Sequence, residues 1–299
     1  MNGLQDRLRF PGRLTRMGGV GLWIVLGAAG CQPSNKVAAG APELVSFDVI
    51  GPDGMPVALV TEAGAALVPP LSKFRAVFDR LLDPSTIEIF DPDGGVTPQS
   101  GVAMTTSTPK VHDPVTVAYT PNGDINFYPV FSPGPSLTVT PEGALPCGVS
   151  VTVELNPNKV RSHDQQTPFK PKDDSVKGTL TFATEPFAAT LTIPKPDTGP
   201  DAGSVGTTVP TDSVATVQFN TLVPQEIAGS IHVTFDNPTG MPGKAIVMQD
   251  KVDSTLWKIA PPDTGWPVGT VKIDISADAA DTYGTTLGTA VAGSFEVAQ

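Results

Sequence analysis

Two cysteines are the residues of this 299-residue chain with the most distinctive chemistry. Cys31 directly follows Ala28-Ala29-Gly30, and Cys147 lies far from it in the sequence. A thiol can carry a lipid, ligate a metal or form a disulfide. If Cys31 carries a lipid, Cys147 has no intrachain partner and is either a reactive thiol or a small buried apolar side chain.

The other candidates for catalysis or metal binding form no known constellation. The histidines, His112, His163 and His232, lie far apart, and none belongs to a His-x-x-x-His or Cys-x-x-Cys spacing. No Gly-x-Ser-x-Gly elbow occurs, and the sequence leaves a Ser-His-Asp site assembled across strands open without favouring it. The acidic turns Asp91–Gly95 and Asp197–Asp201 lack the regular calcium loop with its distal Glu. We therefore expect no enzymatic activity, no cofactor and no metal site.

A basic segment and then an apolar segment precede Cys31. Residues 1–16 carry four Arg, and residues 17–29 are uncharged, which suits a signal peptide and is short of the ~20 residues that a membrane span needs. The stretch Ala28-Ala29-Gly30-Cys31 resembles a bacterial lipobox, although Ala28 stands where Leu is more common. The resemblance implies a cleaved signal peptide over 1–30 and a Cys31 that carries diacylglycerol and palmitate and binds the membrane. An ordinary cleavable signal and an uncleaved anchor are the alternatives.

The segment after Cys31 indicates which membrane to expect, and the charge of the mature chain limits the kinds of partner. Residues 31–42 are polar and contain proline, which indicates a lipidated flexible tether. Gln32 replaces the Asp that resembles an inner-membrane retention signal, so we expect the outer membrane of a diderm cell envelope. Without residues 1–30, the chain keeps 15 basic and 29 acidic residues, a formal net charge of −14. This acidic balance without a basic block excludes nucleic acid as an expected partner.

The rest of the chain consists of short runs that alternate apolar and polar residues. With 32 Pro and 30 Gly, few windows are long enough for a helix. Short alternating runs that end at turn residues predict an antiparallel all-β fold. The predicted strands are Val45–Ile50, Arg75–Phe78, Ile87–Phe90, Val115–Tyr119, Ile125–Tyr128, Leu137–Thr140, Val149–Leu155 and Thr179–Thr184.

The second half of the chain repeats a series of motifs of the first half in the same order. The five pairs are Phe78–Leu82 with Phe219–Val223, Ile87–Ile89 with Ile231–Val233, Leu137–Pro141 with Trp257–Pro261, Leu145–Gly148 with Trp266–Gly269, and Leu180–Phe182 with Ser294–Val297. The repeat predicts two similar domains over 43–186 and 187–299. In this alignment Cys147 takes the place of Val268, which favours a buried apolar role. Trp257 and Trp266 take the places of Leu137 and Leu145, which favours core packing over stacking on sugars.

These motifs resemble those of the bacterial Ig-like domains called SbsA Ig-like. The residues that carry the resemblance are Phe78–Pro84, Leu137–Pro141, Leu145–Gly148 and Leu180–Thr184. The resemblance implies two tandem Ig-like antiparallel β-sandwiches without catalytic residues. It further implies a lipid-anchored structural, spacer or adhesive module of the cell envelope. The alternative is an accessory lipoprotein that binds a glycan or calcium through two long loops of the first domain, the insertion-like stretch Gly94–Pro135 and the hydrophilic segment Arg161–Asp174.

Overall fold

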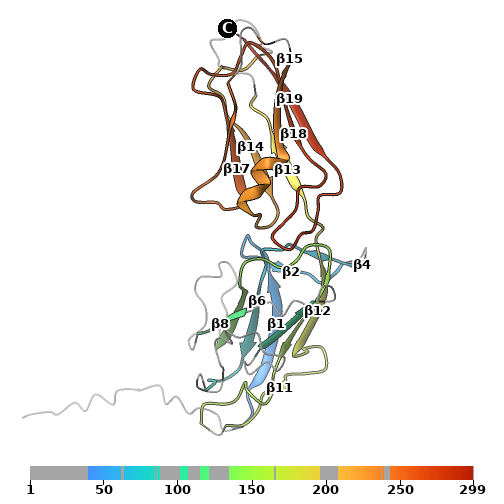
Figure 1. Cartoon of the computed structure of the whole chain (residues 1–299). Helices are drawn as coiled ribbons and strands as arrows, with labels where there is room; N and C mark the ends of the chain where they lie inside the picture. The colour runs from blue at the N-terminus through green and yellow to red at the C-terminus, as the bar shows by residue number, and fades with distance from the viewer. Residues whose placement is uncertain are drawn as a thin grey trace, which may run out of the picture. The chain divides into compact units, whose positions relative to one another are not determined.

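Short strands form two pairs of β-sheets in the computed structural model (Figure 1). The model describes residues 40–298 except 62–63, 84, 86, 88–101, 107–114, 121–134, 165, 196–207, 237 and 239–242. These residues also include the short 3-10 helix η2 (Gln225–Ser230). No helix in the described part of the chain is long and apolar enough to cross a membrane.

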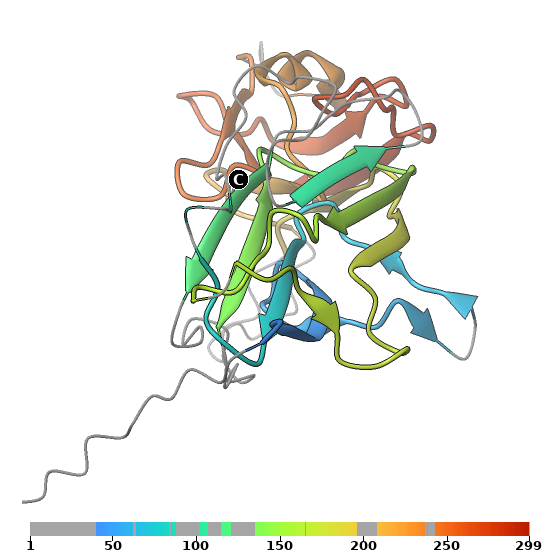
Figure 2. The same ribbon diagram turned by 90° about the horizontal axis from the view of Figure 1, so that it is seen from below.

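The first pair of sheets uses the strands that precede residue 185. One sheet has the order β11 (Lys170–Pro171), β1 (Glu43–Ile50), β6 (Lys73–Phe78), β9 (Ser136–Pro141) and β8 (Val115–Thr120), with β2 (Pro56–Val57) also on β1. The facing sheet has the order β5 (Leu67–Val68), β12 (Thr179–Thr184), β10 (Ser150–Leu155) and β7 (Val102–Thr106). A separate two-stranded hairpin joins β3 (Val60–Thr61) to β4 (Gly64–Ala65) and appears in light blue at the side of Figure 2.

The second pair of sheets follows a short connector, Glu185–Ala188. One sheet has the order β13 (Ala189–Thr192), β14 (Ala215–Phe219), β17 (Leu256–Ala260) and β16 (Ile246–Gln249). The facing sheet has the order β15 (Ile231–Asp236), β18 (Gly269–Ile275) and β19 (Val291–Val297). Both pairs belong to one compact unit of the chain.

The two sandwiches repeat the same strand order. The series β1-β6-β9-β8 corresponds to β13-β14-β17-β16, and β12-β10-β7 corresponds to β19-β18-β15. Motifs that match in the sequence lie on matching strands, because β9 and β17 carry one pair of motifs and β12 and β19 carry another. The predicted all-β sandwich architecture is therefore confirmed.

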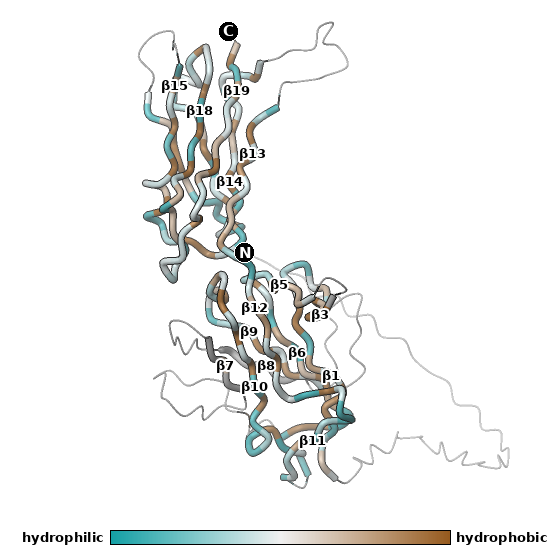
Figure 3. The backbone as a smooth tube through the Cα atoms, turned by 90° about the vertical axis from the view of Figure 1, so that its right-hand side faces the viewer, coloured by the Kyte–Doolittle hydropathy of each residue, from teal (hydrophilic) through white to brown (hydrophobic). Residues whose placement is uncertain are grey.

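Alternation of apolar and polar residues determines which face is buried in strands such as β10 and β18, whereas the central strand β6 is buried on both faces from Phe74 to Phe78. In β6, Phe74, Ala76 and Phe78 are completely buried in the core of the first sandwich. In β18, Val271, Ile273 and Ile275 are buried while Lys272 and Asp274 are exposed, and hydrophobic and paler segments alternate along this strand in Figure 3. Each buried Val, Leu, Ile or Phe side chain contributes about 1.5–3 kcal/mol relative to exposure, so these faces hold the sheets together.

Three expectations about the first sandwich need correction. The stretch Gly94–Pro135 is not a loop as a whole, since it supplies β7 to one sheet and β8 to the other. The segment Arg161–Asp174 is tied to the fold by β11, which pairs with the start of β1. The sandwich is not wholly antiparallel, because β11 on β1 and β5 on β12 are parallel pairs.

Two of the predicted strands cannot be compared with the structure. Ile125–Tyr128 and residues 88–90 of the predicted strand Ile87–Phe90 lie outside the described residues. Ile87 itself is buried in the first core and is not part of a strand.

The two repeat tryptophans are core residues, as predicted. Trp257 is 1% exposed and Trp266 is 2% exposed. They differ in the hydrogen bonding of the indole N–H. The Trp266 indole N–H donates to the Ser213 carbonyl over 2.6 Å. The Trp257 indole N–H has no hydrogen-bond partner in the described part of the chain.

Replacement of each tryptophan by phenylalanine should therefore lower the free energy of unfolding by unequal amounts. Both changes delete a similar volume, but Trp266→Phe also leaves a carbonyl without its donor, which costs about 1 kcal/mol more. Urea unfolding of the two variants measures the difference, with Val252→Ala as a control because Val252 is 97% exposed. Equal losses for the two tryptophan variants would contradict this assignment.

Candidate functional site

Most residues that the sequence singled out lie outside the described part of the chain. This applies to Cys31, His112, Asp91–Gly95 and Asp197–Asp201. Lipidation of Cys31 therefore stays a prediction.

The remaining histidines lie apart on the surface. His163 and His232 are exposed, and the His232 Nε2 lies 3.2 Å from the Ser276 hydroxyl oxygen. No group of three His, Cys, Asp or Glu residues in the described ranges is arranged to hold a metal ion. Among the described residues, the structure brings none of the predicted polar side chains together into a site.

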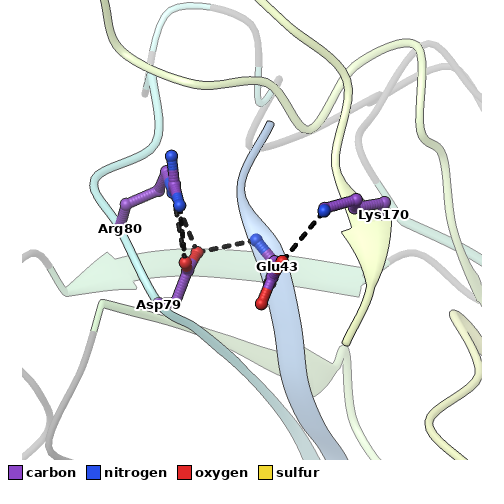
Figure 4. A network of polar contacts seen from close by, with 4 residues as sticks. All are labelled: Glu43, Asp79, Arg80 and Lys170. Carbon is purple, nitrogen blue, oxygen red and sulfur yellow. Dashed lines mark hydrogen bonds and ion pairs between the residues drawn. The ribbon is translucent and has the colours of Figure 1, made fainter. Parts of the chain in front are cut away.

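A polar network holds the start of β1, close in sequence to the predicted tether (Figure 4). The Glu43 backbone N–H donates to the Asp79 carboxylate over 2.7 Å. The Asp79 carboxylate in turn pairs with Arg80 at 2.9 Å, and the Glu43 carboxylate pairs with Lys170 of β11 at 2.9 Å. Partial burial raises the pKa of Asp79, but hydrogen bonds from Arg80 and from the Glu43 N–H outweigh it and the pKa lies below its ordinary value. The network fixes a strand end and offers no nucleophile.

Cys147 lies in the core of the second sandwich, although the chain reaches it before that sandwich begins. Its side chain is 2% exposed and belongs to the second apolar cluster. The expectation of a buried apolar role is confirmed, but the location is not that of Val268, since Cys147 joins one sandwich to the other. Burial, followed by the negative charge of Asp281, raises the pKa of the Cys147 thiol to about 12.

Asp281 is the buried acidic residue beside this thiol. It is 3% exposed, and its Oδ1 accepts the backbone N–H groups of Tyr283 over 2.9 Å and Thr285 over 2.8 Å. Its Oδ2 has no hydrogen-bond partner among the described residues. The buried Cys147 thiol is close enough for the charge of Asp281 to raise its pKa, so two segments far apart in sequence meet here.

Further contacts at the same place cross between the sandwiches. The Tyr283 hydroxyl donates to the Ala144 carbonyl over 2.7 Å. We call the set Ala144, Cys147, Asp281 and Tyr283 the junction. The sequence reasoning missed Asp281 and Tyr283, and the available signal was the turn-forming Asp281-Thr282-Tyr283-Gly284, which does not reveal burial.

The connector between the sandwiches is held to the second one. Phe187 stacks on Phe219 with ring centroids 5.7 Å apart. The Asn220 side chain donates to the Pro186 carbonyl and accepts the Ala188 N–H, each over 2.9 Å. Because Asn220 satisfies the polar groups on both sides of Phe187, the connector is fixed in both its apolar and its polar contacts.

A groove of about 750 Å³ lies on the first sandwich where one edge of each sheet is incompletely paired. Its walls come from β1, β12, the β3–β4 hairpin and the segment before β12. The lining combines hydroxyl and apolar side chains with one acid, Asp48, and one base, Lys177. The sequence reasoning did not find this groove, because pairing gaps are properties of the sheets and not of any motif.

Comparisons with known proteins add no identification. No family model matches the chain, and no curated protein matches it. Among solved structures, the chain is similar to the N-terminal part of the bacterial S-layer protein SbsC at 13% identity and a TM-score of 0.26, covering 88% of this chain and 45% of that one. It is similar to SbsC domains 5–6 at 12% identity and a TM-score of 0.21, covering 86% of this chain and 98% of that one. Likenesses at this level carry no argument about the activity of this chain.

The junction predicts an unreactive thiol. A rise in the pKa from 9.0 to about 12 lowers the thiolate fraction at pH 8 by about 1,000-fold. In a Cys31→Ser background, Cys147 should therefore resist iodoacetamide at pH 8 in the folded protein and react fully in urea. Mass spectrometry of the alkylated protein measures this, and rapid labelling of the folded chain would disprove the buried contact.

Proposed function

We propose that this chain is a lipid-anchored cell-envelope protein in which two tandem Ig-like domains act as a structural, spacer or adhesive module without enzymatic activity. The proposal places the signal peptide at 1–30, the lipid on Cys31, the tether at 31–42 and the domains at 43–186 and 187–299. We further propose the outer membrane as its location, from the Gln32 that follows the lipidated cysteine.

The observation that carries the proposal is the junction. A spacer must keep its modules connected when the chain is loaded, and here a buried contact and a fixed connector replace a flexible linker. Flexible linkers between domains are rich in Gly and Ser, whereas Glu185–Ala188 contains neither.

The alternative of a ligand-binding lipoprotein has less support from the described residues. The stretch Gly94–Pro135 that it invokes contributes two strands to the sandwich. Deletion of the whole stretch would therefore remove β7 and β8 and would not test ligand binding.

The anchor is tested on the protein extracted from cells. The wild-type N-terminal peptide should begin at residue 31 and carry the mass of the lipid, and Cys31→Ser should abolish both the lipid and partition into the detergent phase. Cys147→Ser is the matched control, since it removes the other thiol and should leave the lipid in place. A free N-terminal amine at another residue would contradict the lipidation of Cys31.

The junction is tested by calorimetry. With the junction intact, the two sandwiches should unfold in one cooperative transition. Asp281→Ala removes the acceptor of two backbone N–H groups, at a cost of about 1–3 kcal/mol, and should split the transition into two.

Asp278→Ala is the control for the calorimetry, because Asp278 is an exposed acid close by in the same connection. Two separate transitions in the wild-type protein would contradict a spacer that depends on the junction.

A further inference from the structure

The sheet edges beside the groove are paired at their ends and open between them. β11 pairs with Glu43 and Leu44 of β1, and β2 pairs with Val49 and Ile50, so no strand among the described residues covers the middle of β1 on that side. On the facing sheet, β5 pairs with Ala183 and Thr184 and leaves the first part of β12 open. An open strand edge is a template for another strand.

The pairing pattern identifies which backbone groups face the groove. At one end of β12 the Gly178 carbonyl accepts the Leu155 N–H, and at the other end the Thr184 N–H donates to the Val149 carbonyl. Because antiparallel residues alternate in direction, the even-numbered residues of β12 bond to β10 and the N–H and C=O groups of Thr179 and Thr181 point the other way. The same argument applies to β1. The Gly51 N–H donates to the Met55 carbonyl on the β2 side, so the backbone N–H and C=O groups of Val49 and Phe47, two and four residues earlier, point to that side and toward the groove. No backbone hydrogen bond of Phe47, Thr179 or Thr181 into the groove is found among the described residues.

The chain leaves this edge open because the hairpin turns away. If β5 extended backwards from Leu67 in its parallel register, the preceding residues would pair with the start of β12. Instead, Gly64 and Ala65 pair with β3, and Val60 and Ala65 become part of the groove wall. The part of the groove beside Thr179 and Thr181 is therefore bordered by the hairpin but not occupied by it.

The groove surface matches a neutral extended polypeptide. Leu59 and Val176 pack against the first core from the groove side, and Val60 is 81% exposed at the rim. Asp48 and Lys177 balance in charge. Sugars are usually held by aromatic faces and buried polar groups, and the groove lining has neither, because Phe47 is the one aromatic residue and its ring lies in the core.

We propose that this groove binds an extended segment of a partner protein, which adds as a strand to the open edge of β12. The backbone of Thr179 and Thr181 supplies the pairing, and small or β-branched side chains of the segment contact Leu59, Val60 and Val176. Strand addition derives affinity from main-chain hydrogen bonds and specificity from the contacts of alternate side chains. Four open residues, Thr179–Phe182, span about 13 Å at about 3.3 Å per residue. The proposal goes beyond the spacer function and needs neither the lipid nor the junction.

A random decapeptide library displayed on phage, selected on the full mature protein, provides the probe. Enriched peptides are resynthesised and titrated against wild type, Thr181→Pro and Thr181→Ala. Thr181→Pro removes an N–H that points into the groove and spares the bonds to β10. Thr181→Ala is its matched control, because both variants lose the hydroxyl that lies 3.2 Å from Thr152 and only one loses the N–H. We expect at least a tenfold loss of affinity for Thr181→Pro and less than threefold for Thr181→Ala.

Two further measurements keep the test decisive if Thr181→Pro does not fold. Hydrogen exchange of the wild-type protein should show at least tenfold slower exchange at Thr179 and Thr181 with the peptide bound. Peptides with alternate backbone nitrogens methylated should not bind.

Three results would overturn the proposal: no enriched peptide, equal binding of the methylated peptide, or unchanged exchange at these two amides. Saturable binding of a glycan that Thr181→Pro abolishes would instead assign the groove to sugars. None of these results bears on the lipid anchor, which the N-terminal mass tests separately.

Discussion

The burial of apolar side chains between the two sheets of each sandwich is the constraint on which the other features depend. In both sandwiches the inward positions are large and apolar, from Phe74 and Phe78 in the first to Trp257 and Ile259 in the second. A slip of one residue in register would turn these side chains to solvent, so the alternation fixes where every strand lies. The outward positions are thereby free to vary, which explains why the two sandwiches keep one strand order while their surfaces differ.

The junction shows how a repeated motif acquires a second use. Leu145-Pro146-Cys147-Gly148 and Trp266-Pro267-Val268-Gly269 both lead into the central strand of the three-strand series that the sandwiches share, which is β10 in one copy and β18 in the other. In the first copy this turn also lies against the second sandwich, where Cys147 meets Asp281. An unpaired buried carboxylate would cost several kcal/mol. The backbone N–H groups of Tyr283 and Thr285, which donate to Asp281, lower that cost.

The sequence predicted the all-β class, six strands close to their observed bounds and the buried tryptophans, because each follows from local alternation or from the repeat. It did not predict β11 or β5, which are two residues long and gain their pairing from distant strands. Within Gly94–Pro135 the sequence predicted β8 but not β7, because the residues of β7 do not show a clear alternation of apolar and polar types. Asp281 and the open edge of β12 escaped notice for a related reason, since burial and unpaired edges arise only when segments far apart in sequence meet.

The network around Glu43 has a mechanical consequence. A pull on the proposed membrane tether would reach the fold close to the first residue of β1. β1 is bonded to β6 over most of its length and to β11 at the loaded end. A lengthwise pull strains these hydrogen bonds together, in shear, whereas a sideways pull would break them one after another. The pairing of Glu43 with Asp79 and Lys170 thus places the first resistance to extension at the point where force enters.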